Sequence, residues 1–231
     1  MASPAGSSAR RSCESSSRCG DALVTRAECH DAAMTDELPP YAALLTHHVE
    51  EVDRWKAGFD DHEPARRTAG ILGHHINCAK DDPHLITLFL TLSDLDDAKA
   101  FTASPELGGV MRTIGVVSPP QIQWLQPIRN EIVSNRQLPA FLLRHQVADF
   151  ETWLTGYDAA GELQHSAGII GHGANRSLDD PSLVTVYHQA ESFEALHRFL
   201  ADPQLQIVMK EAGVTSVPDV TFHTGGWAKI Y

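Results

Sequence analysis

The sequence predicts an α+β fold built from two ferredoxin-like β-α-β-β-α-β modules in tandem, closed against each other within one chain. Three observations lead to this prediction. The sequence repeats itself at a fixed offset of 98 residues, and strand and helix patterns follow the same order in each copy. In addition, 42% of the 231 residues are hydrophobic, which is typical of a globular protein.

The repeat aligns residues 43–125 with the second copy without a gap. The matches include His47 with His145, Trp55 with Trp153, Gly73 and His74 with Gly171 and His172, and Asp81-Asp82-Pro83 with Asp179-Asp180-Pro181. So many matches in one register indicate two copies of one structural unit. We expect a disordered tail at 1–33, a first module at 34–126, a linker at 127–138 and a second module at 139–231.

Each copy opens with a short apolar run, residues 42–49 or 140–147, which predicts a strand. A helix follows, because Val52, Trp55 and Phe59 recur at helical spacing, and this pattern places Trp55 in the core. A glycine ends this helix in both copies. The second strand, which carries the repeated Gly-His pair, comes next.

A third strand in each copy is rich in β-branched and aromatic residues, which strands favour. Asp94 and Ser192 are suitable N-caps for the second helix of the two copies. Pro105 interrupts this helix in the first copy, since proline suits only the first helical turn. A short fourth strand, residues 121–125 in the first copy and 220–223 in the second, completes each unit.

The order β-α-β-β-α-β gives an antiparallel sheet that carries both helical segments on one face and leaves the other face bare. Two such sheets cover each other when they pack face to face. A tandem chain supplies both halves of this arrangement with pseudo-twofold symmetry. We therefore expect a monomer, which is itself a pseudo-dimer, or a homodimer of such chains.

Charge and cysteine content narrow the function. The formal net charge of −12 argues against nucleic acids and anionic membranes as partners, because both attract clustered Lys and Arg. No apolar run approaches the ~20 residues that span a bilayer. Three of the four cysteines lie within residues 1–33, so the repeated body holds one thiol, which fits a reducing, cytoplasmic compartment. For residues 1–33, the alternative to a disordered tail is a translation start at Met34.

Several short blocks are similar to a known group of bacterial proteins. They are His47-x-Val49, His62-Glu63-Pro64, Asp81-Asp82-Pro83 and Ser104-Pro105-Glu106-Leu107. They resemble dimeric α/β-barrel proteins that are often labelled antibiotic-biosynthesis-monooxygenase-like or "cyclase". The resemblance implies an intramolecular dimeric α/β barrel. It also implies the activities of that superfamily: cofactor-free monooxygenases, polyketide cyclases, lactone isomerases and haem-handling proteins. In the second copy Ala160-Gly161-Glu162 replaces the His-Glu-Pro block, so the two halves are not expected to be equivalent.

Two histidine pairs recur in the repeat, and we take all four residues as candidate catalytic groups: His74, His172, His47 and His145. An imidazole with its ordinary pKa near 6.5 suits proton transfer at neutral pH. His74 and His172 each follow a repeated glycine, and a bulge at such a glycine would aim them into the barrel lumen. For His47 and His145 strand alternation leaves both faces open, and packing against apolar neighbours is the alternative role.

The third strand of each copy has one amphipathic face, which suits a lumen, and one apolar face, which suits packing against helices. Arg144 and Tyr187 occur only in the second copy, where they could anchor an anionic or phenolic group. A structural role for Arg144 is the alternative. The candidate ligand-binding residues are Arg144, Tyr187, Phe89, Thr87, Thr185, Trp124 and Phe222.

We expect neither a metal nor a cofactor. Strand alternation sends His74 and His75 to opposite faces, and no dinucleotide or P-loop fingerprint is present. The sequence therefore favours a barrel that binds a small hydrophobic molecule. The predicted activity is that of a cofactor-independent monooxygenase, cyclase or isomerase on a polyketide-like substrate. The alternatives are a non-catalytic binding or stress-associated barrel, and a haem-binding barrel.

Overall fold

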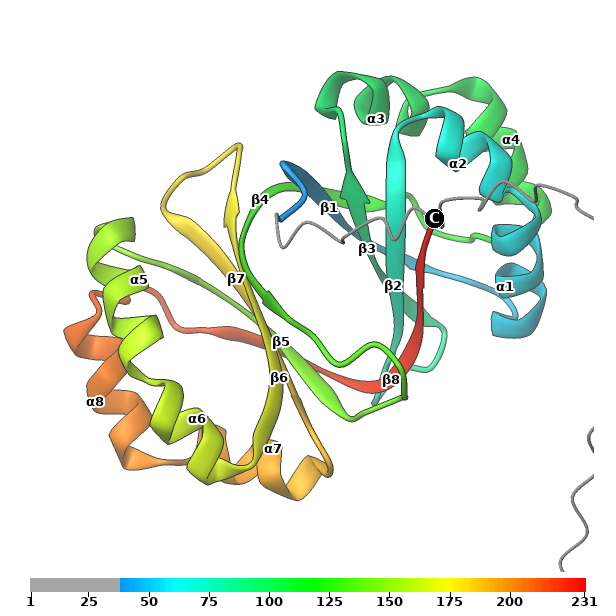
Figure 1. Cartoon of the computed structure of the whole chain (residues 1–231). Coiled ribbons are helices and arrows are strands. Elements are labelled where there is room, and N and C mark those ends of the chain that lie inside the picture. Colours follow the sequence, from blue (N-terminus) through cyan, green and yellow to red (C-terminus); the bar gives the residue numbers. More distant parts are fainter. Residues whose placement is uncertain (1–37) are drawn as a thin grey trace, which may run out of the picture. The chain divides into compact units, whose positions relative to one another are not determined.

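The computed structural model describes residues 38–231, and the tail predicted at 1–33 lies outside them. Each module has the predicted order, with both helical segments split in two (Figure 1). The first module comprises β1 Tyr41–His48, α1 Val52–Asp61, α2 Glu63–Thr68, β2 Ile71–Ala79, β3 Leu85–Leu92, α3 Leu95–Thr102, α4 Pro105–Thr113 and β4 Gln121–Glu131. The second comprises β5 Ala140–Gln146, α5 Phe150–Ala159, α6 Gly161–Ala167, β6 Ile169–Ser177, β7 Leu183–Ala190, α7 Phe193–Leu200, α8 Pro203–Glu211 and β8 Asp219–Ile230.

Helix starts follow from local hydrogen bonding. The Asp94 side chain accepts the backbone N–H of Asp97 at the start of α3, and the Ser192 side chain does the same for Ala195 at the start of α7. Both predicted N-caps are therefore confirmed. Pro105 is the first residue of α4, where its missing N–H has no helical partner to lose.

The eight strands form one closed antiparallel barrel in the order β1-β3-β2-β8-β5-β7-β6-β4. Within each module the third strand lies between the first and the second, which is the ferredoxin-like arrangement. Helices α1–α4 cover one side of the barrel and α5–α8 the opposite side (Figure 1). The predicted fold class, two tandem modules in an intramolecular barrel, is confirmed.

The fourth strands are longer than predicted, and their extra length closes the barrel. Residues Gln121–Leu125 of β4 pair with β1 of their own module, whereas Leu125–Glu131 pair with β6 of the other module. Strand β8 pairs in the same way with β5 and then β2. Since β4 continues to Glu131, the connection between the modules is shorter than the predicted linker at 127–138.

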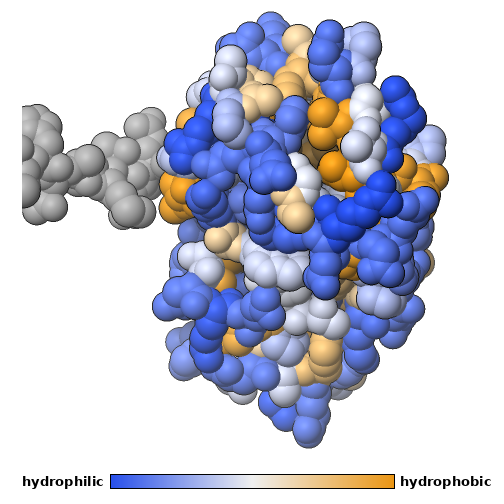
Figure 2. Space-filling model, turned by 90° about the vertical axis from the view of Figure 1, so that its right-hand side faces the viewer, coloured by the Kyte–Doolittle hydropathy of each residue, from blue (hydrophilic) through white to orange (hydrophobic). Residues whose placement is uncertain are grey.

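The core lies in two layers between sheet and helices, with a third, smaller cluster inside the barrel. Trp55 and Trp153 are buried in the two outer layers, and Leu44 and Leu142 belong to the inner cluster. Hydrophilic residues cover most of the face shown in Figure 2. No helix within residues 38–231 is long and apolar enough to cross a membrane.

The crossing of β8 from one module to the other leaves no room for a side chain at Gly226. A Cβ atom there would overlap the backbone carbonyl oxygen of Ile76, which cannot turn aside. We expect Gly226→Ala to lower the free energy of unfolding by about 1–3 kcal/mol, the usual cost of overpacking. Chemical denaturation monitored by tryptophan fluorescence measures this loss.

The matched control is Gly161→Ala, because no atom lies within 4 Å of a Cβ atom at that position. This variant should be as stable as the wild type or slightly more so, since alanine favours a helix. An equal loss of stability in both variants would contradict the tight crossing.

Candidate functional site

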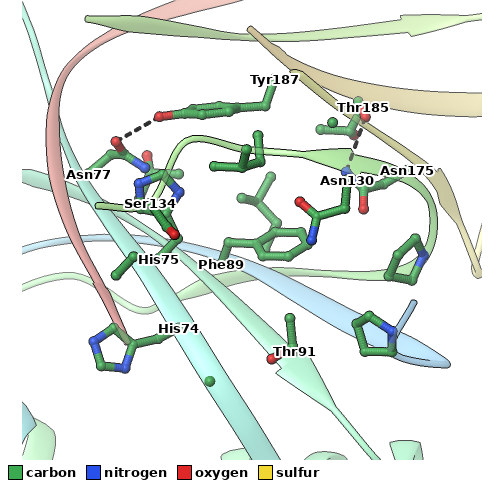
Figure 3. Close-up of a pocket in the computed structure, with 18 of the residues that line it drawn as sticks. His74, His75, Asn77, Phe89, Thr91, Asn130, Ser134, Asn175, Thr185 and Tyr187 are labelled. Atoms are coloured by element: carbon green, nitrogen blue, oxygen red, sulfur yellow. Dashed lines mark hydrogen bonds between the residues drawn. The ribbon is translucent and has the colours of Figure 1, made fainter. Parts of the chain in front are cut away.

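The barrel lumen contains a cavity of about 490 Å³, which is within the usual range for small-molecule sites. Both modules line it, through β2, β3, β6 and β7 and the exchanged ends of β4 and β8 (Figure 3). Residues between β4 and β5 complete one part of the wall. The cavity is therefore a shared product of the two modules.

Strands β3 and β7 present the face that their alternation indicated. Thr87 and Phe89 of β3, and Thr185 and Tyr187 of β7, line the cavity. Their neighbours on the opposite face, such as Leu88, pack against the helices. Four of the seven predicted ligand-binding residues thus lie in the lumen.

A hydrogen-bonded pair and an imidazole meet across the lumen. The Tyr187 hydroxyl donates to Oδ1 of Asn77 over 2.9 Å, and the His75 ring stands edge-on to the Tyr187 ring with centroids 5.5 Å apart (Figure 3). Burial raises the pKa of Tyr187, so the phenol stays protonated. Burial also lowers the pKa of His75 to about 4, so the imidazole is neutral at pH 7.

A second polar pair lies deeper. Nε2 of His223 is 2.9 Å from the Thr87 hydroxyl, and the His223 side chain is fully buried. Burial, and next the neighbouring His75, lower the pKa of His223 to about 4. The charged residues that line the cavity belong to the exchanged strand ends, where Arg129 is paired with Asp158 and Lys229 with Glu63.

The structure places His74 and His172 differently from His75. A register shift does occur beside each repeated glycine. Beyond it both His74 and His75 line the cavity, but the His75 ring faces Tyr187, whereas His74 lies at the edge. The His74 ring packs on Phe59 at the edge of the cavity, and its Nδ1 lies 2.8 Å from the Tyr231 hydroxyl. Nδ1 of His172 meets the Tyr157 hydroxyl at 3.1 Å, outside the cavity lining.

His47 and His145 lie in the outer layers, against Trp55 and Trp153, with ring centroids 5.5 and 5.9 Å apart. They alternate with the lumen-facing residues of β1 and β5, which settles the face that the sequence left open. All four ring nitrogens are buried without a hydrogen-bond partner. Burial lowers the pKa of both histidines to about 4. At His47 the neighbouring His48 also lowers the pKa, by a smaller amount. Neither ring reaches the cavity.

Three predicted ligand-binding residues do not line the cavity either. Arg144 is ion-paired with Asp219 over 2.5 Å and is partly exposed. Trp124 and Phe222 lie on the outer face of their strands and pack against the helix layers, because Leu125 and His223 take the inner face. Their aromatic character alone did not reveal the side on which they lie.

Sequence reasoning missed His75, Asn77 and His223. A signal for the first two existed, because His75 pairs with Phe89 and Asn77 with Thr87 on the adjacent strand. Paired residues share a face, so the lumen face of β3 fixes that of β2. Among residues 38–231, no three His, Cys, Asp or Glu side chains are grouped to hold a metal ion.

No protein-family model matches the chain, and no curated protein does. Solved structures match it in fold. An anthrone oxidase-like protein has a TM-score of 0.62 and 13% identity, over 84% of this chain and 94% of that one. A proposed monooxygenase from Lactobacillus acidophilus has a TM-score of 0.56 and 13% identity, over 84% of this chain and 99% of that one. A proposed chlorite dismutase has a TM-score of 0.51 and 12% identity, over 80% of this chain and 94% of that one.

The chain has the dimeric α/β-barrel fold. It closes this barrel with a single polypeptide. Identities of 12–13% show the fold alone and not the activity.

The buried histidines predict a loss of stability in acid. In the unfolded chain a histidine titrates near 6.5, whereas burial lowers the pKa of His145 to about 4 and that of His188 to about 3. The unfolded state therefore binds more protons below pH 6.5. The stability that these groups contribute is complete above 6.5 and falls as the pH drops toward 4. Urea denaturation across this range measures the slope.

His145→Phe keeps a ring of similar size in an apolar site and removes one titrating group. Within this window its slope should be smaller than that of the wild type by up to about 1.4 kcal/mol per pH unit, the value of one proton. The exposed His165→Gln is the control and should keep the wild-type slope. An unchanged slope in His145→Phe would show that this imidazole does not carry the effect.

Proposed function

We propose that the barrel is a cofactor-independent enzyme that acts on a neutral, hydrophobic, polyketide-like compound held in the lumen. The observation that carries this proposal is the neutral imidazole of His75, which faces the Tyr187–Asn77 pair in a largely apolar cavity. An aromatic ligand would lie against Phe89 and the inner leucines, and its oxygen would meet the phenol.

The chemistry that suits this arrangement begins with removal of a proton from a carbon that is conjugated with a ketone, as the methylene carbon of anthrone is through its aromatic rings. Nδ1 or Nε2 of His75 accepts the proton. The Tyr187 hydroxyl turns its O–H from Oδ1 of Asn77 to the enolate oxygen that forms and donates a hydrogen bond to it. With an anthrone, dioxygen then takes up the electrons of the carbanion. One oxygen atom stays on the carbon and the other leaves as water, so anthrone and O₂ give anthraquinone and H₂O.

The same proton transfer would serve a cyclisation or an isomerisation, in which the carbanion attacks within the substrate or is protonated elsewhere. The oxygenation has additional support, because two structural neighbours are described as an anthrone oxidase-like protein and a proposed monooxygenase. We take anthrone as the first test compound for this reason.

Oxygen uptake with anthrone, without any added cofactor, tests the proposal. His75→Gln should lower kcat by about 10²–10⁴, the usual contribution of a general base. Turnover in the wild type should also fall as the pH drops through about 4, because protonation of His75 removes the base. A circular dichroism spectrum would verify the fold of the variant.

His74→Gln is the matched control, since it changes the adjacent histidine, which lies at the edge of the cavity and packs on Phe59 instead of facing Tyr187. It should retain most of the turnover. Equal rates in wild type and His75→Gln would remove His75 from the mechanism, and a large loss only in His74→Gln would assign the role to its neighbour.

A non-catalytic binding barrel is the alternative from another class. The observation that favours it is the low basicity of His75, whose pKa of about 4 makes it a weak base. In that case anthrone and related compounds would bind without oxygen uptake. Isothermal titration alongside the oxygen electrode separates the two functions.

A haem-binding barrel fits the cavity less well. A haem needs an axial ligand and cations for its two propionates. The neutral imidazole of His75 could serve as an axial ligand, but Arg129 and Lys229 already pair with Asp158 and Glu63 and are not free for the propionates. We therefore expect no haem binding, and a Soret band on haem titration would contradict this expectation.

A further inference from the structure

The two pseudo-equivalent halves of the lumen differ at one decisive position. His75 on β2 pairs with Ala228, and in the same register Gly173 on β6 pairs with Asn130. At this position the first module presents an imidazole to the cavity, and the second module presents no side chain.

A side chain from another part of the chain occupies the space beside Gly173. A Cβ atom at Gly173 would lie 3.5 Å from Cδ1 of Ile132, which follows β4 and lines the cavity. Ile230 stands at the corresponding position in the second module. It also lines the cavity, but it is 77% exposed. Ile132 is only partly exposed, because it packs over Gly173, where the first module carries the His75 side chain.

Residues 132–138, which we call the strap, connect the two modules across this half of the cavity. Gln189, which is 1% exposed, holds the strap with both ends of its amide. Its Oε1 accepts the backbone N–H of Val133 over 2.8 Å, and its Nε2 donates to the backbone carbonyl of Val133 over 3.1 Å. Release of the strap would leave this buried amide unsatisfied, which is costly.

Two further contacts fix the strap. Gly171 lies beneath the two hydrogen bonds between Gln189 and Val133. A Cβ atom there would collide with Oε1 of Gln189 and would crowd the backbone of Val133. At the other end Leu138 is buried, and its backbone lies against Gly225. In the first module Thr91 stands at the position of Gln189, and its side chain is too short to form the same two hydrogen bonds.

We propose that the strap plugs the second half-site, so that the barrel takes one ligand per chain, with Ile132 as the end wall and Gln189 as its positioning residue. The ligand is a planar, neutral aromatic compound whose length is limited by Ile132. The proposal rests on the proposed function for the class of ligand, and it assigns no part of the chemistry to the strap.

Isothermal titration with 2-naphthol, anthrone and the four-ring naphthacenone tests the proposal. The wild type should bind one molecule per chain. Ile132→Ala should raise the affinity for naphthacenone relative to 2-naphthol by about tenfold or more, the effect expected when a pocket gains the room of a few methylene groups. Ile132→Trp should change the ratio in the opposite direction.

Gln189→Thr introduces the residue of the first module and should shift the ratio in the same direction as Ile132→Ala. It should also speed hydrogen exchange at the Val133 amide, which a loss of global stability alone would not single out. Arg136 lies on the strap and forms an exposed ion pair with Glu191. Arg136→Gln removes this pair and is the control. Both the affinity ratio and the exchange rate should stay at wild-type values in this variant.

Two ligands per chain, or an unchanged ratio in Ile132→Ala and Gln189→Thr, would overturn the proposal. So would the failure of all three compounds to bind. Binding of these compounds without oxygen uptake would instead contradict only the proposed enzyme activity. The two ideas are thus separated by one set of measurements.

Discussion

The exchange of strand ends between the modules is the interaction on which the rest of the molecule depends. The first half of β4 pairs within its own sheet and the second half pairs with β6, and β8 does the same with β5 and β2. These ladders remove every free edge of the two sheets. They also bring the bare faces together and enclose the lumen, so fold closure and cavity formation are one event.

The repeat and the strand periodicity were sufficient to predict the module order and the packing of two sheets face to face. The capping residues Asp94 and Ser192 predicted the helix starts, and the family resemblance implied the barrel. They could not give the length of β4, because the partners of its second half lie in the other module and leave no local pattern. Alternation assigns residues to two faces without saying which face is inside. For that reason His47 and Trp124 were candidates for the site, although both lie in the outer layers.

Low polarity governs the electrostatics of the lumen. Burial keeps His75 and His223 neutral and Tyr187 protonated, so the inner groups act as hydrogen-bond donors and acceptors without net charge. A charged ligand would lose its hydration and find no opposite charge deep inside. The chemistry of these residues therefore supports the proposal of a neutral ligand.

Fusion of the two modules into one polypeptide also changes how the site can evolve. In a homodimer every substitution appears twice, so a new residue on one side of the twofold axis is imposed on the other. Here a single mutation alters one wall of the barrel and leaves its counterpart untouched. The two modules differ in this way at two equivalent pairs of positions, His75 with Gly173 and Phe89 with Tyr187. Fusion of two modules thus turns a symmetric barrel into one whose two ends can be selected separately.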